Sequence, residues 1–432
     1  MKRSLFILLL AVSAGSHAQQ RLTLADAVNT ALKKSYDIQL AKNSLEINTI
    51  NNNAGVAGGL PTVNANISDN EQITTINQKF TDATRDTKRD NVGSNNLTAG
   101  VTGSILLFNG FRVTATRQRL NELQHQSESL LNAQIQNTIA SVETKYYEIV
   151  RQQQFMKTIQ QSIEVSRQRL AILRARQEAG MANNADIYQS QLDLNTLLQS
   201  QITQQLTIDQ AKTDLLRLVF TTPDSSIVIQ DTITFNNEIS LDAIRGRIQS
   251  NPLLVSADQQ IRINEFIERE VAAQRYPTLR ANTGYNFSSN KSGAGFSLLN
   301  QSYGPFVSVS LAIPIYNGGI FKKQQQVAAI NTRSAKAIRE TTALDLETAA
   351  VRAYQSYAST LLQIKTEKEN YKLAQDLVNL VMQRFQLGQA TIVEVKQAQE
   401  SFELAGFRLV NLSYTAKNAE IELKRLSSQL TP

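Results

Sequence analysis

The residues that could do chemistry in this chain are few. The 432-residue sequence has no cysteine, and of its two histidines only His125 lies beyond the first 18 residues, in a polar stretch. The absence of cysteine removes thiolate chemistry, disulfides and cysteine metal sites. Counting does not exclude a serine or carboxylate mechanism, but Glu143 and Glu148, which flank Tyr146 and Tyr147, have spacings that more simply give solvated or paired helix faces. We therefore predict a protein that is not an enzyme and has no cofactor and no metal site.

The net charge does not indicate a nucleic-acid partner. The formal charge of +7 includes Lys2 and Arg3 at the N-terminus. A nucleic-acid interface would concentrate its positive charge on one face or arm, whereas here Lys and Arg alternate with Asp, Glu and many Gln residues. We expect these charges to lie on solvated helix faces.

The N-terminus has the three-part form of a secretory signal peptide. Lys2-Arg3 precede an apolar run from Leu5 to Val12, and the small-residue ending Ser16-His17-Ala18 follows. We predict cleavage after Ala18, so that residues 1–18 are removed. The apolar run is far shorter than the roughly 20 residues that a spanning helix needs. No later segment is apolar enough to span as a helix, so a membrane position would require strands closed into a barrel.

Two Gly-containing breaks organise the rest of the chain. The segment Arg384–Ser401 aligns with Arg176–Asp193 when Gly388 is placed on Gly180, at an offset of 208 residues. The same offset places Asn317-Gly318 on Asn109-Gly110. About 70 residues from each Asn-Gly pair to each Gly break thus match without an insertion, which indicates an internal duplication.

Each copy contains the same series of elements. We predict a first structural repeat at 19–223, with a hairpin at about 61–107 and long helices at about 111–178 and 185–220. A linker at 224–238 follows, with a boundary near Asp224. The second repeat at 239–432 has a hairpin at about 278–315 and long helices at about 320–387 and 392–426.

The long helices are predicted from an absence of breakers and from a seven-residue period. No Pro or Gly occurs in 111–178 or in 320–387, and each run would make a helix on the order of 100 Å long. Apolar residues that recur every seven mark coiled-coil seams, which require neighbouring helices. The predicted seams are Val142, Ile149, Met156, Ile163 and Leu170; Ile330, Ala337, Leu344, Val351 and Ala358; and Ile187, Leu194, Ile208 and Leu215.

The hairpins are predicted from alternating apolar and polar residues. Such alternation occurs in 61–67 and 97–102, and again in 277–285 and 306–313, and it is typical of half-buried strands. We expect a polar loop within each hairpin, the second at 288–304. The alternation fits an outer-membrane barrel to which several protomers contribute strands. A soluble four-strand sheet packed on helices is the alternative.

The chain resembles the TolC family of outer-membrane efflux proteins over nearly its whole length after residue 18. The resemblance rests on the order short helix, helix, hairpin, long helix, Gly break, helix, which occurs twice. It also rests on Leu107-Phe108-Asn109-Gly110, Ile315-Tyr316-Asn317-Gly318 and the turn Leu387–Val395. The implied fold is mainly α with a membrane β-barrel: long coiled-coil-like helices form a trimeric α-barrel, and two hairpins per protomer give a 12-strand barrel. The linker and the C-terminal end would form an equatorial belt.

The function that the resemblance implies is that of an outer-membrane exit channel. The channel would serve a tripartite efflux or type I secretion system as a homotrimeric tube that extends from the periplasm to the exterior. A periplasmic adaptor (membrane fusion protein), which would open the tube at its periplasmic tip, an inner-membrane pump and outer-membrane lipid would be its partners.

The resemblance also assigns site residues. The adaptor-docking tip would contain Gly180, Met181, Ala182, Asn183, Gly388, Gln389, Ala390 and Thr391. The periplasmic gate, a ring around the lumen, would contain Glu394, Gln397 and Asp186. Gln397 is an amide where some family members carry a carboxylate, so a double acidic ring is not expected. Three Glu394 side chains near a three-fold axis would attract cations.

The alternative function is that of a soluble periplasmic coiled-coil adaptor or a structural protein. An adaptor would carry one long helical hairpin and separate β domains, and a fibre would not need two amphipathic hairpins. Walls rich in Gln and Asn suit drugs, metal ions and unfolded polypeptides alike, so the sequence does not specify a transported substrate.

Overall fold

The structure is a computed structural model that describes residues 20–223, 227–235, 239–293 and 297–430. The predicted signal peptide and the predicted boundary near Asp224 therefore lie outside the described residues. The chain divides into two compact units. One comprises residues 1–41, 131–254 and 343–432, and the other comprises residues 42–130 and 255–342.

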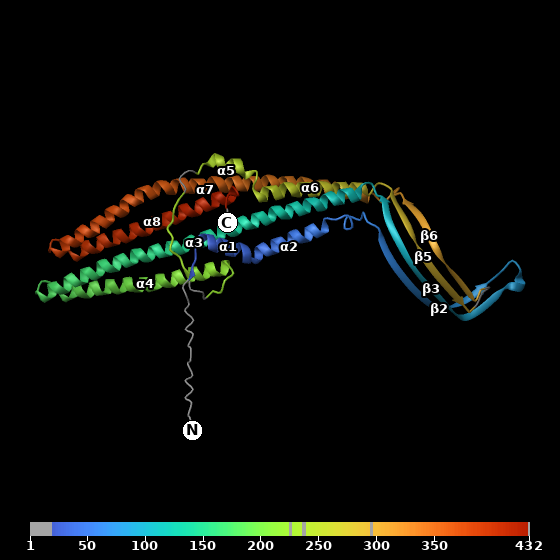
Figure 1. The fold of residues 1–432 in the computed structure, drawn as a ribbon, viewed down its shortest axis with the longest axis horizontal. Coiled ribbons are helices and arrows are strands. Elements are labelled where there is room, and N and C mark those ends of the chain that lie inside the picture. Colours follow the sequence, from blue (N-terminus) through green and yellow to red (C-terminus); the bar gives the residue numbers. More distant parts are fainter. Residues whose placement is uncertain (1–19, 224–226, 236–238, 294–296, 431–432) are drawn as a thin grey trace, which may run out of the picture. The chain divides into compact units, whose positions relative to one another are not determined.

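The first unit is helical. It holds α1 (Leu24–Lys34), α4 (Asn184–Leu218), α5 (Leu241–Ile248) and α8 (Ile392–Leu426), together with the parts of α3 (Arg112–Glu178) and α7 (Ile320–Gln386) that fall within it. Figure 1 shows α3 running beside α4, and α7 beside α8. No Gly or Pro interrupts these four long helices except at Gly406, where Thr158 packs closely against the backbone of α8.

The duplication is visible in the backbone. The helices α3 and α7 each have 67 residues and α4 and α8 each have 35, and their bounds differ by the predicted 208 residues. The left-handed residues that flank them repeat too: Gly110 corresponds to Gly318, and Phe220 corresponds to Ser428. The two copies therefore share backbone conformation as well as helix lengths.

The predicted seam of α3 is buried along its whole length, from Val142 to Leu170. In α4, Leu194, Ile208 and Leu215 are buried as predicted, and Ile187 is half-buried. The seams pack into apolar clusters that link α3 with α4 and α8. Since these residues fill the spaces between helices, the seven-residue period located the core of this part correctly.

The predicted seam of α7 is wrong. Ile330 is 54% exposed and Leu344 is 65% exposed. Within the first unit the buried residues of α7 that recur every seven begin one position earlier than predicted, at Ala350, Tyr357, Ile364, Val378 and Phe385. The helix carries apolar residues on more than one face, and periodicity alone does not say which face the same chain covers.

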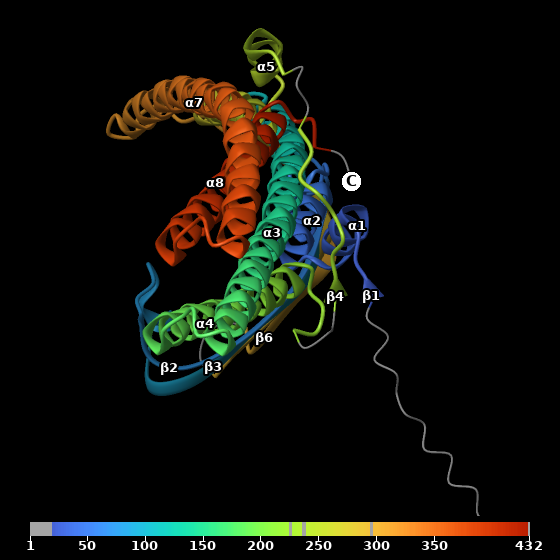
Figure 2. The same cartoon turned by 90° about the vertical axis from the view of Figure 1, so that its left-hand side faces the viewer.

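Residues 227–235, which lie between the two copies, run along the first unit as a strap. Its strand β4 (Ile227–Val228) pairs in parallel with β1 (Gln20–Arg21), and Figure 2 shows the two strands together. The hydroxyl of Tyr146 donates to the carboxylate of Asp231, and Lys417 donates to the Thr234 carbonyl at 3.1 Å. We call residues 227–235 the strap. Side chains of α3 and α8 thus anchor its backbone and its one acidic group.

The second unit contains an antiparallel four-stranded sheet with the order β2-β3-β5-β6. Figure 1 shows the strands as one curved layer. Polar contacts bind the helices of this unit, such as that of Arg119 of α3 to Glu270 of α6 at 2.6 Å. The bounds are β2 (Thr62–Gln78), β3 (Thr87–Phe108), β5 (Thr278–Ser292) and β6 (Leu299–Ala312), with α2 (Tyr36–Asn51) and α6 (Pro252–Ala273) as the additional helices that enter this unit.

The predicted loops within the hairpins are too long. The segment 288–304 is strand up to Ser292 and again from Leu299, and β2 continues to Gln78 rather than ending near residue 67. These strand ends carry polar residues on both faces, so no alternation marks them, and pairing in the sheet decides their conformation. At its other end the second hairpin is shorter than predicted. β6 ends at Ala312 rather than near residue 315, because Pro314 has no N–H to donate to a strand ladder.

Candidate functional site

Both Gly breaks end a helix in the same way. Gly180 and Gly388 adopt φ values of 72° and 82°, which residues with a side chain rarely adopt. In each turn the next residue donates its N–H to the carbonyl five residues earlier, at 2.7 Å in the first copy and 2.8 Å in the second. This is the Schellman arrangement. The backbone conformation of the turn therefore favours glycine at both positions.

The helices after the breaks start at side-chain caps. Asn183 accepts the N–H of Asp186 at 2.8 Å, and Thr391 accepts the N–H of Glu394 at 3.2 Å. The Glu394 carboxylate in turn accepts the Thr391 N–H at 2.8 Å, which completes a capping box. This role of Glu394 was not predicted from the sequence, although the spacing Thr-x-x-Glu before an apolar run is its signal.

The two turns meet in the first unit. The Arg176 guanidinium donates to the Phe385 carbonyl and lies over the Phe385 ring, 4.6 Å from its centroid. Ala182 and Ala390, one from each turn, pack against the same buried apolar cluster, which consists of Leu173, Val378, Val381, Phe385, Val395, Ala398 and Phe402. The segments that the duplication relates thus lie together, and their glycine turns share one apolar base.

The structure leaves most of the predicted site residues at the surface of the single chain. Glu394 and Gln397 are exposed and Asp186 is half-buried, and the hydrogen bonds of the described residues do not join these three side chains to one another. Of the predicted tip residues, Ala182 and Ala390 are half-buried. The exposed ones are Gly180, Met181, Asn183, Gly388, Gln389 and Thr391.

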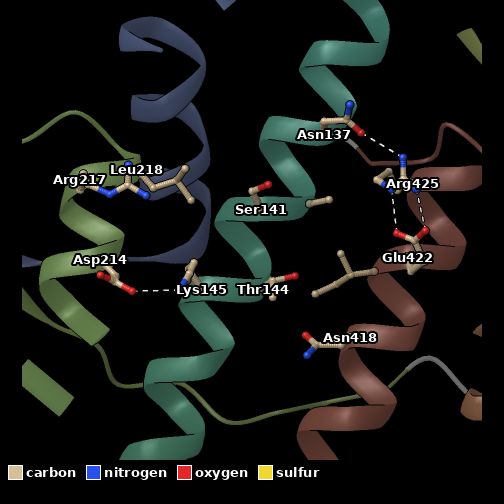
Figure 3. Close-up of a pocket in the computed structure, with 12 residues that line it drawn as sticks. Asn137, Ser141, Thr144, Lys145, Asp214, Arg217, Leu218, Asn418, Glu422 and Arg425 are labelled. Atoms are coloured by element: carbon tan, nitrogen blue, oxygen red, sulfur yellow. Dashed lines mark hydrogen bonds and ion pairs between the residues drawn. The ribbon is translucent and has the colours of Figure 1, made fainter. Parts of the chain in front are cut away.

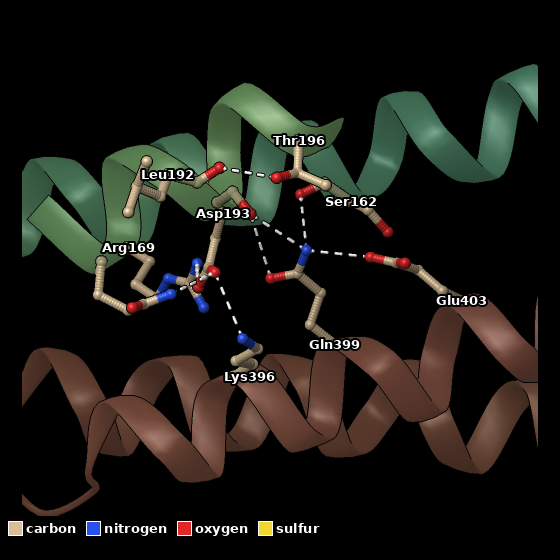
Figure 4. Close-up of polar contacts among 10 residues, drawn as sticks. Ser162, Arg169, Leu192, Asp193, Thr196, Lys396, Gln399 and Glu403 are labelled. Atoms are coloured by element: carbon tan, nitrogen blue, oxygen red, sulfur yellow. Dashed lines mark hydrogen bonds and ion pairs between the residues drawn. The ribbon is translucent and has the colours of Figure 1, made fainter. Parts of the chain in front are cut away.

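A buried polar network lies between the helix pairs and was not found from the sequence. We call it the Arg169 network. The carboxylate of Asp193 on α4 accepts from Arg169 on α3 at 3.0 Å and from Lys396 on α8 at 3.3 Å (Figure 4). The Arg169 side chain is only 1% exposed. Burial lowers the pKa of Arg169, and the Asp193 carboxylate opposes that shift. One carboxylate therefore bridges cations from two other helices.

Gln399 extends the Arg169 network along α8. Its amide nitrogen donates to the Ser166 hydroxyl at 3.1 Å, to the Ser162 carbonyl at 3.3 Å and to the Glu403 carboxylate at 3.0 Å (Figure 4). Gln399 is buried, and both serines belong to α3. Since a buried amide needs its partners, these contacts fix the position of α8 relative to α3.

Only tertiary packing reveals the Arg169 network. In the sequence its members look like charged and polar residues of a solvated helix face. The available signal is positional: Arg169 and Asp193 each directly precede a seam leucine, Leu170 and Leu194. Polar residues beside a seam contact the next helix pair. The sequence pattern of one helix does not predict such contacts.

A pocket of about 530 Å³ lies among α3, α4 and α8. In it Lys145 pairs with Asp214 at 3.0 Å, and Arg425 contacts both Glu422, at 2.7 Å, and Asn137, at 3.0 Å (Figure 3). These contacts join α3 to α4 on one side of the pocket and α3 to α8 on the other. The paired groups thus tie the three helices together.

Three of the residues that could do acid–base chemistry have structural partners. The hydroxyl of Tyr146 contacts the strap, Glu148 pairs with Arg151 at 2.5 Å, and His125 lies 3.1 Å from Glu128. The described part of the chain contains no group of three or more His, Cys, Asp or Glu residues that could hold a metal ion. Within the same residues, no helix is both long and apolar enough to cross a membrane.

Comparison of the sequence with known families finds one match that covers most of the chain. The sequence model of a family described as outer membrane efflux protein matches residues 27–219 and 244–429. These two segments correspond to the two copies of the duplication. Among curated proteins, the outer membrane protein TolC of Vibrio cholerae serotype O1 is 23% identical over 203 residues, and this match spans 45% of each of the two chains.

Solved structures with the same fold include two outer-membrane proteins. The outer membrane protein VceC of Vibrio cholerae has a TM-score of 0.75 at 18% identity, with 94% of this chain and 95% of that chain covered. The CmeC outer membrane channel of Campylobacter jejuni has a TM-score of 0.77 at 14% identity, with 95% and 87% covered. At these identities the likeness concerns the fold alone.

Proposed function

The chain belongs to the outer membrane efflux protein family, a family of channels rather than enzymes, and from this premise we propose that it is the exit channel of a tripartite efflux or type I secretion system. The outer membrane is its location. In the proposal three copies form a continuous tube through the periplasm and the outer membrane, and a periplasmic adaptor connected to an inner-membrane pump opens the tube at the glycine turns.

The observation that carries the proposal is the chemistry of the two faces of the sheet. In an antiparallel sheet, residues that pair in register share a face, and the registers place the odd-numbered residues of the paired stretches 62–74, 93–105 and 278–312 on one face. That face carries large apolar side chains that are exposed in the single chain: Val63, Ile67, Val101, Ile105, Tyr285, Tyr303, Val307, Val309 and Leu311.

The opposite face of the sheet is polar. It carries Asn and Thr or Ser residues on every strand, among them Asn64, Asn66, Thr102, Ser104, Asn282, Asn286, Ser308 and Ser310. Along β6 the apolar row from Tyr303 to Leu311 is about 26 Å long at roughly 3.3 Å per residue. That length suits the hydrocarbon part of a bilayer for tilted strands. An apolar outer face and a polar inner face support a membrane channel with an aqueous lumen.

The free edges of the sheet support assembly of several copies. In one chain β2 and β6 are edge strands, and unpaired backbone groups are not stable in lipid. Joining β6 of one copy to β2 of the next would remove every edge, and three copies would supply twelve strands.

Exposed apolar rows on the helices also support a homotrimer. Leu373 and Leu380 on α7 and Leu387 directly after its end recur every seven residues, and all three are exposed. On α4 the exposed apolar residues are Tyr188, Leu192, Ile202 and Leu206. A seam of this period is stable in water only against another helix. In the proposal these rows pack against neighbouring copies.

The glycine turns would be the docking tip and the gate. In this proposal Gly180 to Asn183 and Gly388 to Thr391 face the adaptor, which agrees with the exposure of six of these eight residues. Glu394, Gln397 and Asp186 would line the narrow end of the lumen. The exposure of Glu394 and Gln397 in the single chain is consistent with that role.

Fractionation and conductance test the proposed function together. Membranes separated on a density gradient should carry the protein in the outer-membrane fraction as an oligomer of three copies, and the purified oligomer should conduct ions in a planar bilayer. Crosslinking in native membranes followed by mass spectrometry should then identify an adaptor and an inner-membrane component. Release of the protein from cells as a soluble periplasmic monomer would overturn the proposal.

A further inference from the structure

A cavity of about 420 Å³ lies in the second unit, between the residues that precede β5 and those that join β6 to α7. Arg275 lines it from the first segment, Ile315 and Tyr316 line it from the second, and Lys322 lines it from the first turn of α7. Its volume is within the range of small-molecule sites. The cavity lies where the chain passes from strand to helix, and neither the gate nor the docking tip includes it.

The cavity carries uncompensated positive charge. Arg275 and Lys322 are exposed, and its lining contains no Asp or Glu. The same sign prevails around it: the junction segments 109–118, 274–277 and 313–325 contain five cationic residues and no acidic one, namely Arg112, Arg117, Arg275, Lys322 and Lys323. Within the described residues no ion pair involves Arg275 or Lys322. The cavity is therefore complementary to an anion.

Apolar groups form the other wall of the cavity. Ile315 is 94% exposed and Tyr316 is 86% exposed in the single chain. Both follow the end of the apolar row of β6, which reaches Leu311. Tyrosine next to cationic residues at the edge of an apolar band is typical of the level of lipid headgroups. An occupant must therefore combine an anionic group with hydrocarbon.

We propose that this cavity binds the phosphodiester headgroup of an anionic phospholipid in the periplasm-facing leaflet, with Arg275 and Lys322 as the phosphate ligands. The proposal rests on the proposed placement of the strands in the outer membrane. Guanidinium and ammonium groups form charge-assisted hydrogen bonds with phosphate oxygens, while the acyl chains continue along the apolar row toward Val309. Free phosphate could use the cations but not the apolar wall.

Titration of the purified full-length protein with phosphatidylglycerol, followed by native mass spectrometry, tests the headgroup site. The double variant Arg275→Gln/Lys322→Gln should lower the apparent affinity for phosphatidylglycerol about tenfold, because both charged phosphate ligands are lost. The matched control Arg333→Gln/Lys365→Gln removes two exposed cations from α7 outside the cavity and should bind like the unmodified protein. Inorganic phosphate at the same concentration should not displace the lipid.

Three results would overturn the headgroup site: equal phosphatidylglycerol binding by the double variant and the control, displacement of the lipid by inorganic phosphate, or protection of this surface by a second copy of the chain. Because the chain has no cysteine, Lys322→Cys and Val309→Cys can each carry one spin label in liposomes. If lipid-soluble oxygen reaches the Val309 label but the double variant binds lipid as the unmodified protein does, the headgroup site is rejected and the membrane placement is kept. A Val309 label that only water-soluble quencher reaches would reject the membrane placement as well.

Discussion

Single charged residues inside the helical unit are shared between partners. Asp193 accepts from Arg169 and from Lys396, and Glu420, which is almost fully buried, pairs with both Lys417, at 3.2 Å, and Lys424, at 2.6 Å. A buried charge is tolerated only with such partners. The consequence is an asymmetry. Loss of a shared residue leaves its partners without that ion pair, whereas loss of one partner leaves the shared residue paired with the other.

That asymmetry predicts different stabilities for two variants of the Arg169 network. Asp193→Asn removes the ion-pair partner of the buried Arg169 guanidinium and leaves Glu403 as the remaining carboxylate that acts on it, and it should lower the free energy of unfolding by about 3–5 kcal/mol. Arg169→Met leaves Asp193 paired with Lys396 and should have a clearly smaller effect. Denaturation followed by circular dichroism on the same oligomeric preparation measures both. An equal loss in the two variants would contradict the assigned sharing.

Glu143 predicts a pH-dependent stability. Burial raises its pKa above the ordinary 4.5, although Lys417 and Lys424 lower it and Glu420 adds to the rise. The folded chain therefore holds this proton more tightly than the unfolded chain, so ionisation of Glu143 destabilises the fold as pH rises through the raised value. Glu143→Gln should melt at a higher temperature than the unmodified protein at neutral pH.

The difference in melting temperature should vanish as the pH falls below 4.5, where the Glu143 carboxyl is protonated in both states. Thermal melts of the two proteins between pH 4 and 7 provide the comparison. His125, which is exposed beside Glu128, offers the control His125→Gln, which should not reproduce the effect. A gap that is constant across this range would show that the amide acts through packing instead.

At the scale of elements, each glycine turn combines a hydrogen-bonded end of one helix with a capped beginning of the next. α3 and α7 each end in a Schellman turn, and α4 and α8 begin at a side-chain cap three residues after the glycine of that turn. In the second copy the carboxylate of Glu394 belongs to the cap. The proposed gate residue therefore has two separable roles, a hydrogen-bond acceptor for its own helix and a charge in the lumen.

Two substitutions separate the roles of Glu394. Glu394→Gln keeps an acceptor that can complete the capping box and removes the charge, whereas Glu394→Ala removes both. If three copies line the lumen with this carboxylate, both variants should lose the block of single-channel current by divalent cations, recorded in a planar bilayer. Only Glu394→Ala should also destabilise the start of α8, by about 1 kcal/mol.

A conservative change of the cap, Thr391→Ser, serves as the control and should keep both the block and the stability. Cation block that persists in Glu394→Gln would assign the carboxylate to the cap alone. Since Gln397 bears no charge, Asp186 would then be the remaining acidic candidate for the gate.

Much of the element order followed from the sequence, and the failures have identifiable causes. The offset of 208 residues located the paired breaks, because both copies place glycine at the positive-φ position of the turn, where it is the favoured residue. The heptads of α3 predicted a buried seam correctly, since that helix buries one row against its own chain. The seam of α7 was misplaced by one residue because Ile330 and Leu344 belong to an exposed face.

The candidate site was less accessible from the sequence. The pattern Thr391-x-x-Glu394 contained the capping box, but the side chains of Arg169 and Gln399 are buried only because two helix pairs pack against each other. Likewise the polar ends of β5 and β6 become strand through pairing with neighbours. Such long-range contacts leave no local pattern.

At the scale of the whole molecule, one copy of the chain exposes surfaces that suit contact with others. The sheet has two free edges and an exposed apolar face, and α4 and α7 carry exposed apolar rows. Isolated apolar residues on a surface are common, but continuous rows indicate interaction sites. The proposed trimer would cover the helix rows with protein, and lipid would cover the sheet.

A charge in the helix row should therefore disrupt assembly. Leu380 is 55% exposed in the single chain, and in the proposed trimer Leu380→Asp would bury an unpaired carboxylate at each interface. We expect the trimer to dissociate at detergent-solubilised concentrations at which the unmodified protein stays intact, as measured by light scattering. Gln375→Asp, also exposed but on another face of α7, should leave the trimer intact, and dissociation of both variants alike would argue against this interface.

The exposed leucine row of α7 has a consequence for biogenesis. A newly exported copy that folds alone would present this row and the apolar sheet face to the periplasm, so folding to completion would depend on encounters with other copies. The rate at which folding is completed should then rise steeply with expression level. At low expression the unassembled copies would need a chaperone that holds them, or they would be degraded. The abundance of the channel would thus depend on the concentration dependence of assembly as much as on the rate of synthesis.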